Sequence, residues 1–336
     1  MKKILITGGA GYIGSHTAVE LLNAGYEIVI IDNFYNSNPK AIKNIKKITG
    51  KNFEFYEGDV CDKILLQKLF SENEIEAVIH FAGYKAVGES VTKPLTYYRN
   101  NIDCTLSLLE IMQEFNCKKF VFSSSATVYG DPERLPIDEK CRLSVTNPYG
   151  ATKLYIEGIL KDLYISDNDW SIAILRYFNP VGAHESGLIG EEPNGIPNNL
   201  VPYIVKVANK ELPYLNIFGN DYNTPDGTGV RDYIHVVDLA KGHLNSLDYI
   251  LKHKGLDYYN LGTGKGYSVL DLVKTFEKVN NVNIPYKIVE RRPGDIATCY
   301  ADPSYAKEKL NWEAKLGLEE MLSSAYNFSR GRNDKE

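Results

Sequence analysis

Tyr149 and Lys153 stand four residues apart in the stretch NPYGATK, directly after Pro148. Proline is common at the first position of a helix, so the stretch predicts a helix start in which the two side chains share one face. A phenol and an ammonium one turn apart could form an acid–base pair, because a nearby positive charge favours the phenolate. Ordinary surface helices show the same loose pattern. The elements around the pair must decide between these two interpretations.

Short apolar runs alternate with amphipathic segments in the first half of the chain. The runs lie at residues 3–7, 27–32, 53–58, 76–83, 119–125 and 171–178, and the segments lie near 14–24, 40–48, 62–72, 94–115 and 149–166. This alternation predicts right-handed βαβ crossovers and a Rossmann-type, doubly wound parallel sheet with helices on both faces. After Pro180, long loops rich in Gly, Pro, Asn and Asp appear, and further helices are expected near 236–252, 268–279 and 317–328.

The stretch ITGGAGYIGSH joins the first apolar run to the first helical segment. Gly8, Gly11 and Gly14 would allow a tight turn, close approach of a pyrophosphate, and tight packing of helix on sheet. The backbone amides of Tyr12 and Ile13 would then face the anion at the helix N-terminus. A glycine-rich turn without a ligand would look similar. The strand before it, the helix after it and an acid 18 residues beyond Gly14 favour a dinucleotide site.

That acid is Asp32, which closes the second apolar run. Its carboxylate can accept both hydroxyls of an adenosine ribose and would repel a 2′-phosphate, so the sequence favours NAD over NADP. The stretch NFYNS that follows contains no Arg or Lys to hold such a phosphate. Asp59, after the third run, could contact the adenine. Ser125, in FSSSATVYG at the end of the fifth run, would present a hydroxyl to the crevice at the carboxyl ends of the strands.

The composition excludes several classes of protein. The chain has 43% hydrophobic and 24% charged residues and a net charge of -5, which predicts a globular fold and argues against a nucleic-acid partner. No signal peptide or membrane-spanning apolar run is evident, so a cytoplasmic protein is expected. No metal motif is seen among the six histidines. The cysteines are odd in number and widely spaced, which argues against a disulfide framework and predicts reduced thiols: Cys61, Cys104, Cys117, Cys141 and Cys299.

Eight motifs together resemble the UDP-glucose 4-epimerase family, a branch of the extended short-chain dehydrogenases/reductases. They are TGGAGYIG, HFAGYKAVGES, SSSATVYG, YGATK, RYFNPVGAH, GIPNNL, DGTGVRDYIHV and NLGTG, and the resemblance runs from about residue 3 to residue 312. TGGAGYIG and YGATK mark only the superfamily, whereas FAGYKAVGES, RYFNPVGAH and DGTGVRDYIHV are specific to the epimerases.

The resemblance implies reversible inversion at C4 of UDP-glucose and UDP-galactose through a transient 4-keto sugar and bound NAD. It implies an NAD-binding domain at 1–179, completed by a segment near 236–262, and a UDP-sugar-binding domain at 180–330. It also implies a homodimer in which the segments near 94–115 and 149–166 pair.

The site residues that the resemblance implies fall into three groups. The catalytic group is Ser125, Tyr149 and Lys153. The cofactor contacts add Gly8, Gly11, Tyr12, Ile13, Gly14, Asp32, Asn33, Asn36, Ser37, Asp59, Val60, Phe81, Ala82, Gly83, Lys85, Asn100 and Phe178. The substrate contacts are Asn179, Asn199, Leu200, Asn216, Phe218, Arg231, Arg292, Asp295 and Cys299, with Gly294 also expected near the nucleotide.

Tyr149 would have to act as a base near neutral pH, and a free phenol has a pKa of about 10. A drop of about three units corresponds to roughly 4 kcal/mol, which one charge about 4 Å away supplies at an effective dielectric of 20. Lys153 is expected to provide that charge and to hold the nicotinamide ribose, and the oxidised nicotinamide is expected to add a second positive charge.

Cys299 bears on the range of substrates. In the family this position borders the C2 substituent of the hexose: a Tyr accompanies enzymes restricted to glucose and galactose, and a small residue accompanies enzymes that also accept N-acetylated sugars. Cysteine here predicts activity on both kinds of UDP-sugar. The alternative is that Cys299 is only a small buried filler.

Two rival functions share the fold. A sugar-nucleotide 4,6-dehydratase would carry an acid pair beside the catalytic hydroxyl, but Ala126 and Thr127 follow Ser125 here. A non-catalytic NAD-binding regulator would be expected to have lost the Tyr or the Lys, and this chain keeps both.

Overall fold

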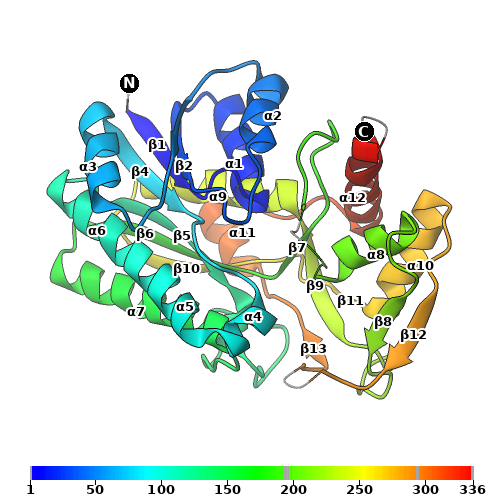
Figure 1. The fold of residues 1–336 in the computed structure, drawn as a ribbon. Helices are drawn as coiled ribbons and strands as arrows, with labels where there is room; N and C mark the ends of the chain where they lie inside the picture. The colour runs from blue at the N-terminus through cyan, green and yellow to red at the C-terminus, as the bar shows by residue number, and fades with distance from the viewer. Residues whose placement is uncertain (1, 193–194, 196, 198, 293–294, 334–336) are drawn as a thin grey trace.

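A seven-stranded parallel sheet forms the centre of the computed structural model, which describes residues 2–192, 195, 197, 199–292 and 295–333 (Figure 1). The order across the sheet is β10-β6-β5-β4-β1-β2-β3, and every neighbouring pair is parallel. Its strands are β1 (Lys3–Thr7), β2 (Ile28–Asp32), β3 (Glu54–Glu57), β4 (Ile75–His80), β5 (Lys119–Ser125), β6 (Ser171–Tyr177) and β10 (Gly255–Leu261). The predicted Rossmann-type fold is confirmed.

The order of the strands reverses at β1. The chain first adds β2 and β3 on one side of β1, and then returns to add β4, β5, β6 and β10 on the other. The loops that leave β1 and β4 therefore diverge from neighbouring strand ends, and ligands of open α/β sheets bind in the crevice between such loops. The glycine loop follows β1 and the stretch FAGYKAVGES follows β4, so both lie at this switch point.

Two layers of helices cover the sheet, which explains why strands such as β2 and β6 are buried along their whole length. On one face, a hydrophobic cluster joins four helices to the sheet. They are α1 (Tyr12–Asn23), α2 (Lys40–Thr49), α9 (Val236–Ile250) and α11 (Ser304–Leu310). A second cluster packs α3 (Lys63–Glu72), α6 (Cys104–Glu114) and α7 (Pro148–Ser166), which Figure 1 shows grouped on one side.

The segment near 94–115, expected as one helix, is divided. It consists of α5 (Pro94–Tyr98), a π-helical turn (Arg99–Asp103) and α6, and a short helix α4 (Val87–Thr92) precedes it. A π-helical turn inside a helix changes the direction in which the following side chains point, and such turns are frequent at functional sites. Here the turn contains Asn100, whose side chain reaches the large cleft described below.

A smaller mixed part lies beside the main sheet (Figure 1). Its sheet has the order β11-β9-β13 with β7 also paired to β9, and β8 pairs with β12 separately. The strands are β7 (Asn179–Val181), β8 (Leu215–Phe218), β9 (Val230–His235), β11 (Gly266–Ser268), β12 (Tyr286–Val289) and β13 (Thr298–Cys299). The helices are α8 (Leu200–Ala208), α10 (Val269–Asn280) and α12 (Leu318–Asn333). Across the described residues, no helix combines the length and apolar character needed to cross a membrane.

The expectation of reduced cysteines throughout is wrong. The structure joins Cys61 and Cys104 as a disulfide across 43 residues of sequence, while Cys117, Cys141 and Cys299 are free. Cys61 follows β3 and Cys104 begins α6, and packing on the same face of the sheet brings their Cα atoms within 4.2 Å. Spacing along the chain cannot reveal such a pair, because the pairing depends on how two distant elements pack.

Candidate active site

One cleft with a volume of about 1700 Å³ runs from the switch point to the smaller part of the molecule. Its walls include the residues that directly follow or end β1, β2, β3, β4, β5 and β6. Every catalytic, cofactor and substrate residue expected from the sequence lines this cleft, except Gly294, which lies outside the described residues. The fold thus gathers residues that are up to 291 positions apart, from Gly8 to Cys299 (299 − 8).

The glycine loop has no room for side chains at two positions. Gly8 has a φ of +68°, and a Cβ there would lie 2.9 Å from the backbone nitrogen of Ala82. A Cβ on Gly14 would lie 2.3 Å from the carbonyl oxygen of Gly8, so α1 can approach β1 only with glycine at this position. Helix α1 begins at Tyr12 with Gly11 as its N-cap and no side-chain cap. Its first amides can therefore bind an anion.

Asp32 ends β2 with a buried carboxylate that is held from both sides. Oδ2 accepts from the backbone nitrogen of Ala10 at 2.9 Å, and Oδ1 accepts from Phe34 N at 2.9 Å and Ser37 Oγ at 2.8 Å. These bonds fix the carboxylate beside the glycine loop. Its charge faces the side of the cleft where a ribose joined to the pyrophosphate would lie.

Asp59 and Asn33 form the next part of the wall. Asn33 Nδ2 donates to Asp59 Oδ2 at 3.1 Å, which ties the turn after β2 to the turn after β3. Tyr35 stacks on Tyr84 in the same wall, with ring centroids 4.5 Å apart. The sequence did not single out these two rings, and a planar base is the kind of ligand that such flat side chains accommodate.

Glu191 connects the cofactor and substrate sides of the cleft, and sequence reasoning missed it. Its Oε1 accepts from Lys85 Nζ at 3.3 Å and from Asn199 Nδ2 at 2.8 Å. The Nζ of Lys85 also lies 5.9 Å from the ring centroid of Tyr12, whose hydroxyl donates to Gly182 O at 2.7 Å. The available signal was the composition of the stretch GLIGEEPNGIPNNL, which is rich in Gly, Pro and Asn and therefore predicts a long loop of the kind that often carries function.

The three catalytic candidates converge at the carboxyl end of β5. Ser125 is the last residue of that strand, and its Oγ accepts from Thr127 N at 3.2 Å and Thr127 Oγ1 at 3.0 Å. Helix α7 begins at Pro148, and the Asn147 side chain caps it by accepting from Gly150 N at 2.9 Å. This cap fixes the first turn, which presents Tyr149 to the cleft with Lys153 one turn behind it.

Burial shifts the pKa values of both Tyr149 and Lys153. Burial raises the pKa of Tyr149 above its usual value, and hydrogen bonding to Ser125 opposes this rise. The Nζ of Lys153 lies 6.0 Å from the Tyr149 ring centroid, and burial lowers the pKa of Lys153 to about 8, against the charge of Glu157. Burial of the phenol works against the expected drop in the pKa of Tyr149, which was expected from Lys153 together with the oxidised nicotinamide and stays a prediction.

A buried ion pair lies behind the three catalytic candidates. Arg176 on β6 donates from Nη2 to Glu157 Oε2 at 2.6 Å, and both side chains are almost fully buried. Ser124, next to Ser125, donates to Glu157 Oε1 at 2.6 Å. Because Glu157 is also one turn beyond Lys153 on α7, this carboxylate links the strand of Ser125 to the helix of Tyr149 and Lys153.

The far end of the cleft carries two guanidinium groups. Arg231 on β9 donates from Nη1 to the backbone oxygens of Val230 at 2.8 Å and Ala297 at 3.4 Å. Arg292 donates from Nε to Asp295 Oδ2 at 3.1 Å and lies 4.7 Å from the ring centroid of Phe218. Two planar cations beside a half-exposed aromatic ring suit a diphosphate joined to a base.

Cys299 faces both the cleft and a small core. It is in register with Arg231 in the pairing of β13 with β9, and it packs against a hydrophobic cluster that includes Phe178. Burial raises the pKa of the Cys299 thiol to about 11, so the side chain is a neutral thiol near pH 7. It is thus a small buried side chain that also borders the ligand space.

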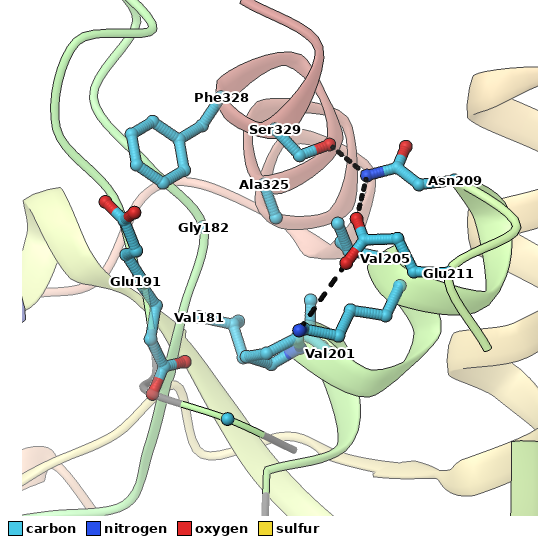
Figure 2. A pocket seen from close by; sticks show the side chains of 14 residues that line it. Val181, Gly182, Glu191, Val201, Val205, Asn209, Glu211, Ala325, Phe328 and Ser329 are labelled. Carbon is cyan, nitrogen blue, oxygen red and sulfur yellow. Dashed lines mark hydrogen bonds and ion pairs between the residues drawn. The ribbon is translucent and has the colours of Figure 1, made fainter. Parts of the chain in front are cut away.

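A smaller pocket of about 240 Å³ lies beside the cleft, between α8 and α12 (Figure 2). Val201, Val205 and Ala325 line it, and Asn209 donates to Glu211 at 3.3 Å and to Ser329 at 3.4 Å on its polar side. Glu191 belongs to the lining of both spaces.

Comparison with known proteins gives a consistent result. The family model described as GDP-mannose 4,6 dehydratase matches residues 5–325. The UDP-glucose 4-epimerase of Bacillus subtilis (strain 168) is 62% identical over 325 residues, covering 97% of this chain and 96% of the relative. The crystal structure of UDP-glucose 4-epimerase from Bifidobacterium longum in complex with NAD+ and UDP superposes with a TM-score of 0.96 at 54% identity, covering 100% of both chains.

A further solved structure, the UDP-Glc/GlcNAc 4-epimerase from Campylobacter jejuni, has a TM-score of 0.86 at 35% identity and covers 98% of this chain and 100% of that one. The family model is named for a dehydratase, whereas the relatives with high identity over nearly the full length are named epimerases. The chain belongs to the UDP-glucose 4-epimerase family of the extended short-chain dehydrogenases/reductases.

Proposed function

We propose that this protein interconverts UDP-glucose and UDP-galactose, and also their N-acetylated counterparts, through a 4-keto sugar. The observation that carries the proposal is the convergence of Ser125, Tyr149 and Lys153 on the cleft that also contains the glycine loop. Inversion of C4 needs no net oxidation, but it needs the hydrogen removed from one face and returned to the other. A C4 hydrogen is not acidic, so a transient ketone is the accessible route.

The cofactor that fits is NAD. The glycine loop and the uncapped start of α1 would hold the pyrophosphate, because Cβ atoms at Gly8 and Gly14 would close that space. Asp32 would hold the adenosine ribose and exclude a 2′-phosphate, and Asp59 would contact the adenine. When bound, NAD supplies the hydride acceptor and donor and, in its oxidised form, a positive charge near Tyr149.

Tyr149 is the proposed base for the C4 hydroxyl and the acid for the reverse step. Burial opposes the phenolate, so its formation requires Ser125 to donate and requires positive charge nearby. Lys153 contributes one such charge from a fixed place, because its Nζ donates to Ser123 O at 2.7 Å. Ser125 would hydrogen-bond the C4 oxygen and assist the transfer of the proton.

The nucleotide is held at the other end of the cleft. Arg231 and Arg292 suit the diphosphate, and Phe218 offers an apolar face to the uracil. Firm binding of the nucleotide together with loose binding of the hexose would let the ketone present its other face without leaving the site. Asn179, Asn199, Leu200 and Asn216 line the space between these two ends.

Activity on N-acetylated sugars rests on Cys299. Its small side chain borders the cleft at a position where a Tyr would add a whole ring. The Campylobacter jejuni relative, which has a similar fold, is named for both UDP-Glc and UDP-GlcNAc, and this supports the proposal.

A homodimer is the proposed assembly. Apolar side chains are exposed on the helical segments expected to pair, with Leu95 81%, Tyr155 53% and Leu106 38% accessible. The chain has a mass of 37.8 kDa, and sedimentation velocity should find a species of twice that mass.

The test of the proposed function is incubation of the purified protein with UDP-galactose and no added NAD. UDP-glucose should appear until the epimers reach equilibrium. A dehydrated keto sugar would favour the dehydratase alternative, and no turnover would favour a non-catalytic NAD-binding protein. A parallel assay with UDP-N-acetylgalactosamine tests whether the protein also acts on N-acetylated UDP-sugars.

A further inference from the structure

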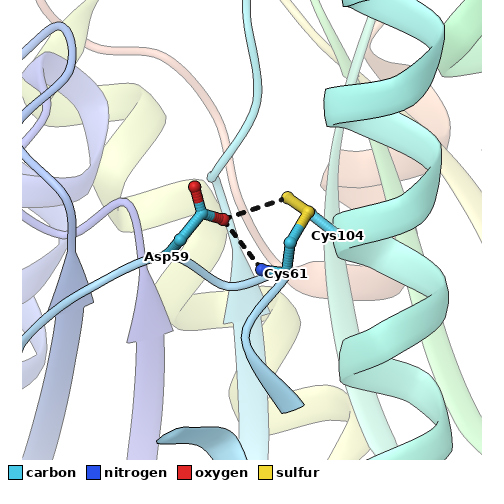
Figure 3. Close-up of side chains that lie close together, drawn as sticks. All are labelled: Asp59, Cys61 and Cys104. Carbon is cyan, nitrogen blue, oxygen red and sulfur yellow. Dashed lines mark hydrogen bonds between the residues drawn. A yellow bond between two sulfur atoms is a disulfide. The ribbon is translucent and has the colours of Figure 1, made fainter.

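Cys61 and Cys104 lie next to Asp59, a residue of the cleft wall (Figure 3). The Sγ atoms of the two cysteines and a carboxylate oxygen of Asp59 all lie within 4.8 Å of one another. Cys104 lines the cleft itself, together with Gly58, Asp59 and Val60. The pair therefore joins the part of the wall that would receive the adenine, and the proposed reaction does not use it.

The position and the burial of the two cysteines suit a disulfide that forms by thiol–disulfide exchange. They come from different elements, and the structure joins their sulfur atoms with the two Cα atoms 4.2 Å apart. Cys61 is only partly buried, whereas Cys104 is 3% exposed. An external thiol reagent would thus reach Cys61 first, and Cys104 stands ready as the resolving thiol.

Asp59 is the group through which the pair can influence the cleft. Its Oδ1 accepts from the backbone nitrogen of Cys61 at 2.8 Å and lies 3.5 Å from the Sγ of Cys104 (Figure 3). In the dithiol form, Cys104 can donate its thiol hydrogen to this oxygen. In the disulfide form, Cys104 has no hydrogen to donate, and the turn that carries Asp59 is tied to the start of α6.

The redox state therefore changes the hydrogen-bonding capacity of the carboxylate. An amino group on an adenine is a donor, and it competes with the Cys104 thiol for the same acceptor. Oxidation removes the competitor and reduces the freedom of the turn, and both effects strengthen binding at this end of the cleft.

We propose that Cys61 and Cys104 are a thiol–disulfide exchange site for low-molecular-weight disulfides, and that closing the disulfide slows the release of bound NAD. The coupling to NAD rests on the proposed function, whereas the exchange chemistry does not. Disulfides in reducing compartments are typically transient and redox-sensing, which fits a pair beside a cofactor site.

The chemistry balances as two successive exchanges. The thiolate of Cys61 attacks one sulfur of the external disulfide, a new S–S bond forms, and one external thiolate leaves. The thiolate of Cys104 then attacks the sulfur of Cys61, and the second external thiolate leaves. The two cysteines lose two electrons and two protons in total, and the external disulfide becomes two thiols. An excess of a dithiol reductant reverses both steps.

The first measurement establishes the site. The holoenzyme is reduced, freed of reductant and treated with oxidised glutathione, and its disulfides are mapped by mass spectrometry of peptides. A Cys61–Cys104 bridge is expected, with Cys117 left as a free internal control, because it is buried and burial raises the pKa of its thiol to about 12. Absence of that bridge, or a bridge to any other cysteine, overturns the proposal.

The second measurement tests the coupling. The rate at which bound nucleotide exchanges for isotopically labelled NAD is compared between the reduced and oxidised holoenzyme. The oxidised form should exchange about fivefold more slowly, equivalent to about 1 kcal/mol, as expected for one net hydrogen bond. Cys61→Ser should exchange at the rate of the reduced protein under both conditions. Equal rates in reduced and oxidised wild type would overturn the coupling.

The two readouts also separate this proposal from the proposed function. If the protein held no NAD, the exchange measurement would show no bound nucleotide at the start, while the disulfide map would still report on the thiol chemistry. Because the main comparison is between reduced and oxidised wild-type protein, the result does not depend on whether a variant folds.

Discussion

The side-chain nitrogen of Lys153 donates to the backbone carbonyl oxygen of Ser123, 2.7 Å away. This bond ties helix α7, which carries Tyr149, to strand β5, which ends at Ser125. The Nζ lies 4.9 Å from the ring centroid of Phe122 and 6.0 Å from that of Tyr149. Lys153 is therefore a charge held in place by the sheet, and its buried position has a measurable cost.

The first prediction concerns that cost. Burial lowers the pKa of Lys153 to about 8, whereas the unfolded value is 10.5. Below about pH 8 both states carry the proton, so the folded state bears the full cost of the buried charge. Between pH 8 and 10.5 the folded state has lost the proton and the unfolded state keeps it, so the cost is relieved as the pH rises.

Urea unfolding of wild type and Lys153→Met, at about pH 7.5 and pH 9.5, measures this effect. The stability of wild type relative to the variant should rise by roughly 2 kcal/mol over that interval. Lys161→Met, which changes an exposed lysine of the same helix, should leave the pH dependence as in wild type. If the difference in unfolding free energy between wild type and Lys153→Met stays constant with pH, Lys153 does not carry the buried charge.

The second prediction concerns Tyr149. Tyr149→Phe removes only the hydroxyl, so the fold and the bound nucleotide should persist while kcat falls roughly 100- to 10,000-fold, the usual contribution of a general acid–base group. Tyr155→Phe, at an exposed tyrosine of the same helix, should retain wild-type kcat. Retention of more than about a tenth of the turnover by Tyr149→Phe would exclude this residue as the base.

The third prediction concerns the choice of cofactor. Since the reduced cofactor must stay until the hydride is returned, denaturing the purified protein should release NAD or NADH, and nucleotide analysis should find no NADP. Asp32→Asn keeps the shape of the side chain but removes its charge, so the variant should contain less NAD and should accept NADP.

Glu57→Gln is the matched control, because Glu57 is in register with Asp32 on the neighbouring strand and is not part of the cleft lining. It should bind NAD like wild type. If Asp32→Asn discriminates between NAD and NADP as wild type does, the role given to this carboxylate is incorrect.

The fourth prediction concerns the range of substrates. Cys299→Tyr should abolish activity on UDP-N-acetylgalactosamine and largely spare activity on UDP-galactose, because the added ring fills the space needed by the acetamido group. Cys299→Ser, which keeps the side chain small, should retain both activities. The ratio of the two rates decides: if Cys299→Tyr leaves it unchanged, or if wild type has no N-acetylated turnover, another residue controls the range.

Much of the fold and cleft could be predicted because the signals are local. Asp32 and Ser125 end apolar runs, and the glycine loop requires small residues at fixed spacing. In a parallel sheet the carboxyl ends of strands meet along one edge, so residues at those ends gather in one cleft. The short strands β7 and β13 gave no such signal, because two or three residues are too few to show a period.

Other features depend on packing between distant elements. Glu191 reaches Lys85 across 106 residues, and Cys61 reaches Cys104 across 43, so neither pairing is visible in the sequence. The burial of Tyr149 is another feature of this kind. The spacing to Lys153 predicts a nearby charge but carries no information on burial, and burial dominates here.

The most direct test of the central claim follows the hydrogen at C4. UDP-galactose carrying deuterium at C4 is epimerised in ordinary water, and the UDP-glucose formed is examined by mass spectrometry and NMR. If the hydrogen leaves as a hydride and returns from the same bound cofactor, the product keeps its deuterium at C4. Loss of the deuterium to the solvent would mean that C4 is inverted through deprotonation, and would contradict the transient ketone on which this account rests.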